Sequence, residues 1–203
     1  MIKNIVFDMG NVLLRFEPET FVERLGLGTE ESNTLLEIVY DAPEWYKQDS
    51  GELTEEAFLK LVEGRLPEEL RQYAYPLVKE WDQPLILVEG MEELISGLKE
   101  KGYGIYLLSN ASTRQPEYWA RVPASKYFDG ALISAEVKML KPEARIYQCL
   151  FETFSLKPEE CVFIDDLEVN IKGAEEQGMQ GYVFDGDVTA LRKYLSSVLS
   201  DFS

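Results

Sequence analysis

The 203-residue chain contains no histidine and only two cysteines. Histidine is the usual general base and the commonest transition-metal ligand in proteins, so proton transfer and metal binding must fall mainly to carboxylates. Oxygen ligands of that kind suit a hard ion such as Mg²⁺. Cys149 and Cys161 lie in apolar stretches without the spacing of a zinc site or a disulfide framework, and we expect both to be reduced core residues.

The chain also lacks a long apolar run and an excess of basic residues. No segment approaches the apolar length that crosses a bilayer, and an acid interrupts the N-terminal MIKNIVFDMG too early for a signal peptide. The 37 acidic and 20 basic residues give a formal net charge of −17, which repels nucleic acid and anionic lipid. We therefore expect a cytoplasmic protein that binds neither nucleic acid nor membranes.

Short apolar segments rich in β-branched residues alternate with segments of helical periodicity in most of the chain. Strands are predicted at residues 2–7, 104–108, 131–134, 161–164 and 181–184, and helices at residues 91–101, 143–154, 168–177 and 188–199. Such alternation is typical of a parallel sheet with helices on both faces. The predicted fold class is therefore α/β, with a three-layer core.

Residues 16–85 follow a different pattern, with helical segments at 18–25, 31–40, 54–62 and 67–81 and no strand signal. Thr54 is predicted to cap a helix, because a hydroxyl accepts from free backbone N–H groups and the acids that follow it suit the helix dipole. We expect residues 1–15 and 86–203 to form an α/β core domain, into which residues 16–85 insert a small all-helical domain.

Polar residues follow four of the five predicted strands. They are Asp8 after the first, Ser109 and Asn110 after the second, Lys141 after the third, and Asp165 and Asp166 after the fourth. Singly, each has an ordinary explanation as a helix cap, a turn residue or a solvated charge. In an open parallel sheet, however, the carboxyl ends of the strands border one ligand crevice. A nucleophilic carboxylate, a hydroxyl and amide pair, a lysine and a second carboxylate pair form the set that phosphoryl transfer needs.

Four segments resemble the successive motifs of the haloacid dehalogenase superfamily, namely FDMGNVLL, LLSN, KPEARIY and FIDDLEVNIKGAEEQGM. The resemblance covers nearly the whole chain, because residues 16–85 are similar to the small helical cap of these enzymes. The first motif is closest to the branch that reads Asp-x-Gly-Asn, which includes bacterial α-D-glucose-1-phosphate phosphatases. The resemblance implies a Rossmann-like core and a Mg²⁺-dependent phosphatase of a small phosphorylated metabolite, with sugar phosphates such as hexose 1-phosphates preferred.

The resemblance also implies a role for each site residue. Asp8 would attack phosphorus to form an aspartyl phosphate, with Lys141 as the second catalytic residue. Mg²⁺ would be held by Asp8, Asp166 and the carbonyl oxygen of Gly10, while Asp165 and Asn170 would orient these groups. The implied phosphate-binding residues are Asp8, Met9, Gly10, Ser109, Asn110 and Lys141.

Gly10 departs from the family pattern, which usually has an acid two residues after the nucleophile. Such an acid protonates the leaving group and then activates water, and a positioned acid or base is typically worth about 10² to 10⁴ in rate. Without it, the rate should depend steeply on the leaving group, and an anomeric hydroxyl leaves more readily than a primary alcohol. An acid introduced at Gly10 should flatten that dependence, unless the glycine adopts a positive φ.

Two other functions fit parts of the sequence. A dehalogenase would use a similarly placed Asp8 to displace halide from carbon, but that chemistry needs no metal and leaves the Asp165 and Asp166 pair unexplained. A non-catalytic phosphate-binding protein would have kept the fold after losing the acid at position 10. Turnover of a phosphate ester distinguishes these functions from a phosphatase.

The inserted helices carry candidates for substrate recognition. A cluster of aromatic and polar residues precedes the Asp-Ser-Gly turn at 49–51 and consists of Glu44, Trp45, Tyr46 and Gln48. Aromatic faces with amide and carboxylate groups suit a sugar ring, but aromatic residues also form the core of a small helical domain. Both interpretations stay open at this stage.

Overall fold

The computed structural model describes residues 1–202 and confirms the α/β fold. Five parallel strands form one sheet in the order β3-β2-β1-β4-β5, so the first strand of the chain is the central one. The strands are β1 (Asn4–Phe7), β2 (Gly104–Ser109), β3 (Gly130–Ile133), β4 (Cys161–Asp165) and β5 (Gln180–Val183). Phe7 pairs with Leu107 on one side and with Ile164 on the other. The carboxyl ends of β1, β2 and β4 therefore lie at the same edge of the sheet.

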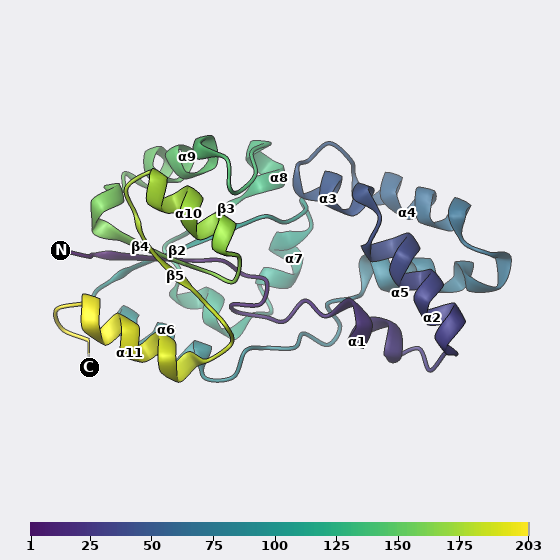
Figure 1. Cartoon of the computed structure of the whole chain (residues 1–203), viewed down its shortest axis with the longest axis horizontal. Coiled ribbons are helices and arrows are strands. Elements are labelled where there is room, and N and C mark those ends of the chain that lie inside the picture. The colour runs from purple at the N-terminus through teal and green to yellow at the C-terminus, as the bar shows by residue number, and fades with distance from the viewer. Residues whose placement is uncertain (203) are drawn as a thin grey trace.

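Helices cover both faces of the sheet (Figure 1). One face carries α9 (Ala144–Phe154) and α10 (Glu168–Glu176), and the other carries α6 (Met91–Glu100) and α11 (Val188–Val198). These four helices match the predicted ranges to within one residue, because each repeats its apolar residues over several turns. Shorter elements, which have too few turns for a periodic signal, were not predicted. They are α7 (Gln115–Trp119), η3 (Pro123–Tyr127), α8 (Ser134–Val137) and η4 (Pro158–Glu160).

Residues of the central strand alternate between two hydrophobic cores. Ile5 and Phe7 pack with the core that includes α6 and α11, whereas Val6 packs with the core that includes α9 and α10. All three side chains are fully buried. Successive side chains of a strand point to opposite faces, so a strand that is covered on both faces needs a continuous apolar run. The apolar sequence that precedes Asp8 is explained by this arrangement.

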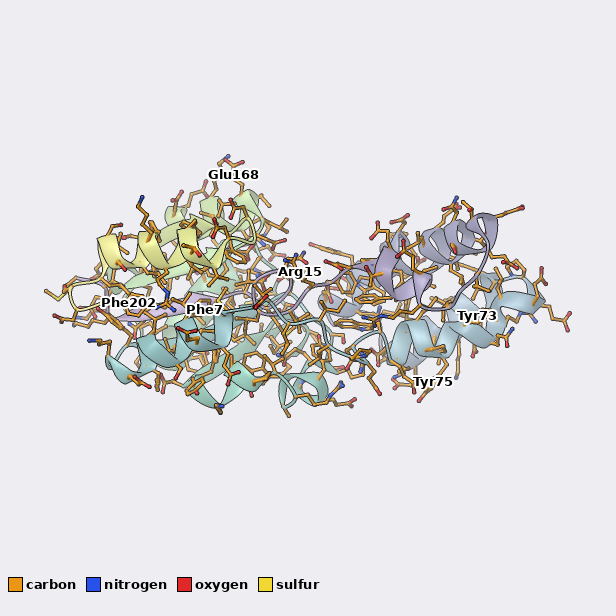
Figure 2. The ribbon with its side chains drawn as sticks, turned by 90° about the horizontal axis from the view of Figure 1, so that it is seen from below. Phe7, Arg15, Tyr73, Tyr75, Glu168 and Phe202 are labelled. Carbon is orange, nitrogen blue, oxygen red and sulfur yellow. The ribbon has the colours of Figure 1, made fainter. Side chains whose placement is uncertain are left out.

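Residues 18–79 form a helical lobe beside the sheet, where Figure 2 labels Tyr73 and Tyr75. Its elements are α1 (Pro18–Glu23), α2 (Thr29–Leu35), the π-helical η1 (Leu36–Tyr40), α3 (Pro43–Asp49), α4 (Glu55–Arg65), the 3-10 helix η2 (Glu68–Tyr73) and α5 (Ala74–Lys79). The hydroxyl of Thr54 accepts from the Ala57 backbone N–H at 3.2 Å, which confirms the predicted cap of α4. The predicted segments 31–40 and 67–81 each divide into two elements, and α3 was not predicted.

Aromatic side chains form the centre of the helical lobe. The ring centroid of Trp45 lies 5.0 Å from that of Tyr40 and 5.4 Å from that of Phe16. Trp81 extends the cluster to Tyr118 of α7, at 5.2 Å. Aromatic pairs at such distances contribute about 0.5–1.5 kcal/mol beyond their buried area. The structure thus supports the core interpretation of Trp45.

Buried ion pairs connect the helical lobe to the core. Nε of Arg114, just before α7, lies 3.0 Å from Oε1 of Glu55 in α4, and its guanidinium also lies 3.0 Å from Oδ1 of Asp82. Asp82 pairs in addition with Arg121, and Glu55 with Lys79 at 2.7 Å. Removing one partner of a buried pair leaves an uncompensated charge, at a cost of about 3–5 kcal/mol. These pairs hold the lobe in place over the carboxyl edge of the sheet.

Two expectations from the composition concern the cysteines and membrane-spanning helices. Both cysteines are free thiols. Cys161 is buried in β4, as expected, whereas Cys149 is only partly buried on α9. Among residues 1–202, none of the helices combines the length and apolar character that a bilayer crossing requires.

Candidate active site

The polar residues that follow the strands meet in one cavity at the carboxyl edge of the sheet. The cavity has a volume of about 350 Å³. The residues predicted from the sequence that line it are Asp8, Met9, Gly10, Ser109, Asn110, Lys141, Asp166 and Asn170. The remaining predicted residue, Asp165, is fully buried and contacts Lys141. The fold therefore brings the predicted residues together.

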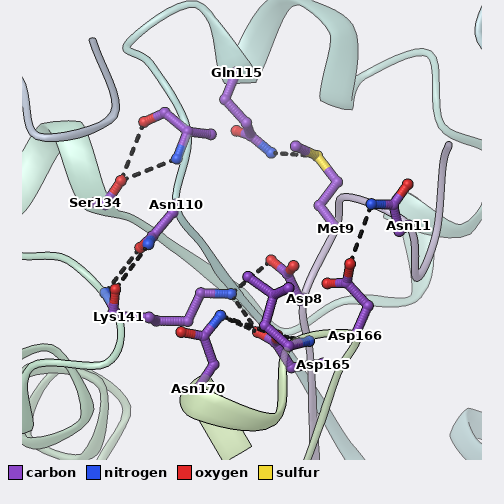
Figure 3. A network of polar contacts seen from close by, with 12 residues as sticks. Asp8, Met9, Asn11, Asn110, Gln115, Ser134, Lys141, Asp165, Asp166 and Asn170 are labelled. Carbon is purple, nitrogen blue, oxygen red and sulfur yellow. Dashed lines mark hydrogen bonds and ion pairs between the residues drawn. The ribbon is translucent and has the colours of Figure 1, made fainter. Parts of the chain in front are cut away.

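Lys141 lies between two carboxylates, as Figure 3 shows. Its Nζ atom is 2.8 Å from Oδ1 of Asp8 and 2.6 Å from Oδ2 of Asp165, and the lysine side chain is almost completely buried. Burial lowers the pKa of Lys141, but the two negative charges outweigh this effect and the pKa lies above its ordinary value. Lys141 is therefore charged, and it places a positive charge beside Asp8.

Asp165 is bonded to protein groups on both carboxylate oxygens. Its Oδ1 accepts from the Leu167 backbone N–H at 2.8 Å, and the side-chain amide of Asn170 donates to Oδ1 and Oδ2 at 3.0 and 3.1 Å. The Tyr147 hydroxyl donates to the carbonyl of Asn170 at 2.7 Å, which holds this asparagine in turn. Asp165 therefore holds the Lys141 side chain, and Asn170 holds Asp165.

Asn110 joins the end of β2 to the loop that carries Lys141. Its side-chain amide donates to the Lys141 carbonyl at 3.0 Å and accepts from the Lys141 backbone N–H at 2.9 Å. The side chain is therefore used to hold the lysine loop. Ser109, which precedes Asn110 and is the last residue of β2, is buried and also lines the cavity.

Three carboxylates form a cluster that could hold a cation. Oxygen atoms of Asp8, Asp165 and Asp166 lie within 4.8 Å of one another. Asp166 is held by Asn11, whose amide donates to Oδ2 of Asp166 at 3.1 Å while its Oδ1 accepts from the Phe16 backbone N–H at 3.1 Å. Because Asp165 is already bonded, the carboxylates open to the cavity are those of Asp8 and Asp166. Hard oxygen donors in this arrangement fit Mg²⁺.

Burial raises the pKa of the Asp8 and Asp166 carboxyls. The pKa of Asp8 rises to about 7, because desolvation and the charge of Asp165 outweigh the charge of Lys141. Burial also raises the pKa of Asp166, against the hydrogen bond from Asn11. A nearby positive charge favours the ionised form of an acid. The two acids therefore lie where a cation would stabilise them.

Gly10 does not have the unusual backbone that sequence analysis considered. Its φ lies outside the left-handed region, and a Cβ atom built on it has no neighbour within 4 Å. The alternative of a positive φ at Gly10 is therefore wrong. The left-handed residue is its neighbour Asn11, at φ 55°, in a region that asparagine adopts more readily than most residues. Asn11 was not among the predicted site residues, although asparagine in a turn after a strand is a signal for this conformation.

Residues of the helical lobe form the opposite wall of the cavity. They are Trp45, Tyr46, Gln48, Asp49 and Glu55. Sequence analysis treated Asp49 as part of a turn and missed it, because the short helix α3 was not predicted. Glu44 does not line the cavity, since its carboxylate accepts two hydrogen bonds from Arg65 at 2.7 and 3.0 Å.

Comparisons with known proteins identify the family. The family model of haloacid dehalogenase-like hydrolases matches residues 2–178. A D-ribitol-5-phosphate phosphatase of Bacteroides thetaiotaomicron is 28% identical over 195 residues, which cover 90% of this chain and 91% of that protein. Bifunctional epoxide hydrolase 2 of Mus musculus is 34% identical over 101 residues, which cover 47% of this chain and 18% of that protein. The chain thus matches less than a fifth of the mouse protein.

A solved structure shows the same fold. It is the crystal structure of a HAD family enzyme from Bacteroides thetaiotaomicron in complex with magnesium and inorganic phosphate. The two structures share a TM-score of 0.71 over 94% of this chain and 99% of that chain, at 24% sequence identity. The family match spans most of the chain and includes the residues that line the cavity. This chain therefore belongs to the haloacid dehalogenase-like hydrolase family.

Proposed function

We propose that this protein is a Mg²⁺-dependent phosphatase that hydrolyses a small phosphorylated carbohydrate through an aspartyl phosphate on Asp8. The observation that carries the proposal is the buried Lys141 in contact with Asp8, with Asp166 in the same cluster. A lysine, a carboxylate at a strand end and an adjacent acid are the groups that phosphoryl transfer uses. The relative that is a D-ribitol-5-phosphate phosphatase supports the substrate class.

The acid cluster supports Mg²⁺ as the cofactor. We expect the ion to be held by the carboxylates of Asp8 and Asp166 and by the carbonyl oxygen of Gly10, which are hard donors. When bound, the ion supplies positive charge that reduces the repulsion between an anionic nucleophile and an anionic phosphate. Asp165 and Asn170 would keep the supporting role that their mutual hydrogen bonds indicate.

The residues at the strand ends form the floor of the cavity, and each has a role in this reaction. Asp8 attacks phosphorus as the ester bond breaks, which divides one difficult displacement into two easier steps. Lys141 neutralises charge on the transferring oxygens, and the Ser109 hydroxyl and the Asn110 backbone N–H donate hydrogen bonds to them. The other residues that we assign to phosphate binding are Met9 and Gly10.

The walls of the cavity favour a sugar. A volume of about 350 Å³ is at the small end for a ligand pocket, as a phosphate with a small organic group requires. Trp45 and Tyr46 offer aromatic faces, and Gln48 offers a buried amide. Among sugar phosphates we prefer hexose 1-phosphates, because the Asp-x-Gly-Asn motif resembles that of glucose-1-phosphate phosphatases and an anomeric hydroxyl is a good leaving group.

These roles also suggest the division of the chain into domains. We propose that residues 1–15 and 86–203 form the catalytic core, since they contain Asp8, Lys141 and Asp166. Residues 16–85 would form the cap that selects the substrate, since they supply the aromatic wall.

Two alternatives make different predictions about metal and turnover. A 2-haloacid dehalogenase needs no metal, whereas Asp166 lies beside Asp8 with no cationic partner of its own within residues 1–202. A non-catalytic protein is favoured only by the missing acid at Gly10. It would bind phosphate in the same cavity and release none.

A phosphate-release screen tests the proposal. The panel should contain D-ribitol 5-phosphate, hexose 1-phosphates and hexose 6-phosphates, each assayed with Mg²⁺ and with a chelator. We expect release that needs Mg²⁺ and that is abolished in Asp8→Asn, whose amide keeps the shape of the side chain but cannot act as the anionic nucleophile. Wild-type activity in Asp8→Asn, or chloride release from a haloacid that persists in chelator, would contradict the proposal.

A further inference from the structure

The core residues leave the leaving group without a proton donor. Gly10 has no side chain at the usual position of the acid. Asp165 cannot take its place, because this residue is fully buried and both of its oxygens are bonded by Lys141 and Asn170. Lys141 is held between two carboxylates. A donor must therefore come from another wall of the cavity.

Asp49 is the acid of the helical lobe that lines this cavity without a partner. It is the last residue of α3, and its carboxyl makes no hydrogen bond or ion pair with any other residue in the range 1–202. Glu55 also lines the cavity, but it is bound by Arg114 and Lys79. Tyr118 of the core also lines the cavity, but burial raises the pKa of its hydroxyl far above the ordinary value. Asp49 is therefore the acid that is free to exchange a proton.

The surroundings of Asp49 raise the pKa of its carboxyl toward neutral pH. Burial raises the pKa of Asp49 to about 7, and the charge of Asp8 raises it further while that of Lys141 lowers it. Asp49 and Asp8 line the same cavity. A general acid works best when its pKa lies close to the working pH.

Contacts with the core fix the backbone of Asp49. Its carbonyl accepts a hydrogen bond from the Ser134 hydroxyl at 2.6 Å, and the same Oγ accepts from the Ala111 backbone N–H at 2.9 Å. Ala111 directly follows Asn110 of the phosphate-binding set. Two residues after Asp49, Gly51 has a φ of +70°, and a Cβ atom there would lie 2.5 Å from the Ala135 carbonyl oxygen. These contacts hold the backbone that carries the Asp49 carboxyl beside the ends of β2 and β3.

We propose that Asp49 is the general acid and base of the reaction, in place of the acid that is absent at Gly10. This inference rests on the proposed phosphatase function. In the first step, the bond from Asp8 to phosphorus forms, the ester P–O bond breaks, and the Asp49 carboxyl gives its proton to the departing alkoxide oxygen. In the second step, the Asp49 carboxylate takes a proton from water as the water oxygen bonds to phosphorus. The bond from phosphorus to Asp8 breaks, which releases inorganic phosphate and returns both carboxyls to their starting states.

The proposal changes the expected dependence on the leaving group. A protein without a proton donor should cleave aryl phosphates far better than primary-alcohol phosphates, as Gly10 alone predicts. With Asp49 as donor, the wild type should show a shallow dependence, because protonation compensates for a poor leaving group. The steep dependence should then be found in Asp49→Asn.

The test compares D-ribitol 5-phosphate, or the best primary-alcohol phosphate of the screen, with 2,4-dinitrophenyl phosphate, whose leaving group needs no proton. In Asp49→Asn we expect kcat/KM to fall about 10² to 10⁴-fold for the alkyl ester and only a few-fold for the aryl ester. Dinitrophenolate should also appear as a burst followed by a slow phase, because the phosphoenzyme loses its base for hydrolysis. The alkyl kcat/KM of the wild type should fall above about pH 7, and this limb should be absent from the variant.

Asp41→Asn is the matched control, since Asp41 is an exposed acid of the same lobe, and it should leave both esters unaffected. Equal losses on the two esters, or no loss, in Asp49→Asn would refute the role of Asp49 while leaving the phosphatase assignment intact. A wild type that hydrolyses neither ester with Mg²⁺ and gives no burst would refute the proposed function itself. If circular dichroism shows that the variant folds poorly, the test is the dependence of the wild-type kcat/KM on the leaving group. A steep dependence overturns the proposal.

Discussion

Replacing Lys141 with methionine should destabilise the protein in a pH-dependent way. Lys141 is 2% exposed, and its Nζ contacts Asp8 at 2.8 Å and Asp165 at 2.6 Å. Methionine has a similar length and preserves the packing, so the main loss is the buried positive charge. Removing one partner of a buried ion pair costs about 3–5 kcal/mol, because the remaining charge is left uncompensated. We expect a loss in this range at about pH 8.5, above the pKa of about 7 that Asp8 has beside Lys141.

The loss should be smaller at about pH 6, because Asp8 can then take up a proton. Its folded pKa of about 7 lies above the value of 3.8 expected in the unfolded chain, so its neutral form stabilises the fold at low pH and this contribution is lost as pH rises through the folded pKa. Without Lys141 that pKa rises further. The stability of the variant should therefore keep falling above pH 7, by up to about 1.4 kcal/mol per pH unit, where that of the wild type has levelled off.

Urea unfolding followed by circular dichroism measures this difference. The experiment should be done in chelator, so that no divalent ion compensates for the missing charge. Lys172→Met is the matched control, since its pair with Glu168 is exposed and should change the unfolding free energy little at either pH. A cost in Lys141→Met that does not depend on pH would show that the two carboxylates do not rely on the lysine charge.

Four further substitutions test the site. Asp166→Asn should raise the Mg²⁺ concentration needed for half-maximal activity more than Asp165→Asn does, whereas Asp165→Asn should cost more unfolding free energy. The reverse order in a metal titration and in thermal melting would show that Asp165 is the metal ligand and Asp166 the supporting residue. Gly10→Asp should fold with a melting temperature close to that of the wild type, because a Cβ there meets nothing within 4 Å, and a large drop would contradict the observed backbone. Gly51→Ala should lower both the melting temperature and the rate on alkyl phosphates, because its φ is +70° and its Cβ would collide with the Ala135 carbonyl; unchanged values would show that this contact is not needed.

The floor of the site was predictable from sequence because it depends on strand order and local motifs. Each strand of a parallel sheet delivers its last residues to one edge, so Asp8, Lys141 and Asp166 could be grouped without knowing any distance. The long helices were predictable for a related reason, since an apolar face repeated over several turns identifies a helix. The cap of α4 at Thr54 follows from chemistry within four residues.

The wall opposite that floor depends on contacts between distant segments. Asp49 lies in a helix too short for a periodic signal, and its position is set by a hydrogen bond from Ser134, 85 residues further along the chain. The pKa of its carboxyl is raised by burial and by the charge of Asp8, which no local pattern encodes. The sequence by itself therefore determined the family, the sheet and the polar residues that form one wall of the cavity. Only the tertiary structure showed that Asp49 is, within residues 1–202, the unpaired acid of the helical lobe that lines the cavity, because its position depends on packing between the lobe and the edge of the sheet.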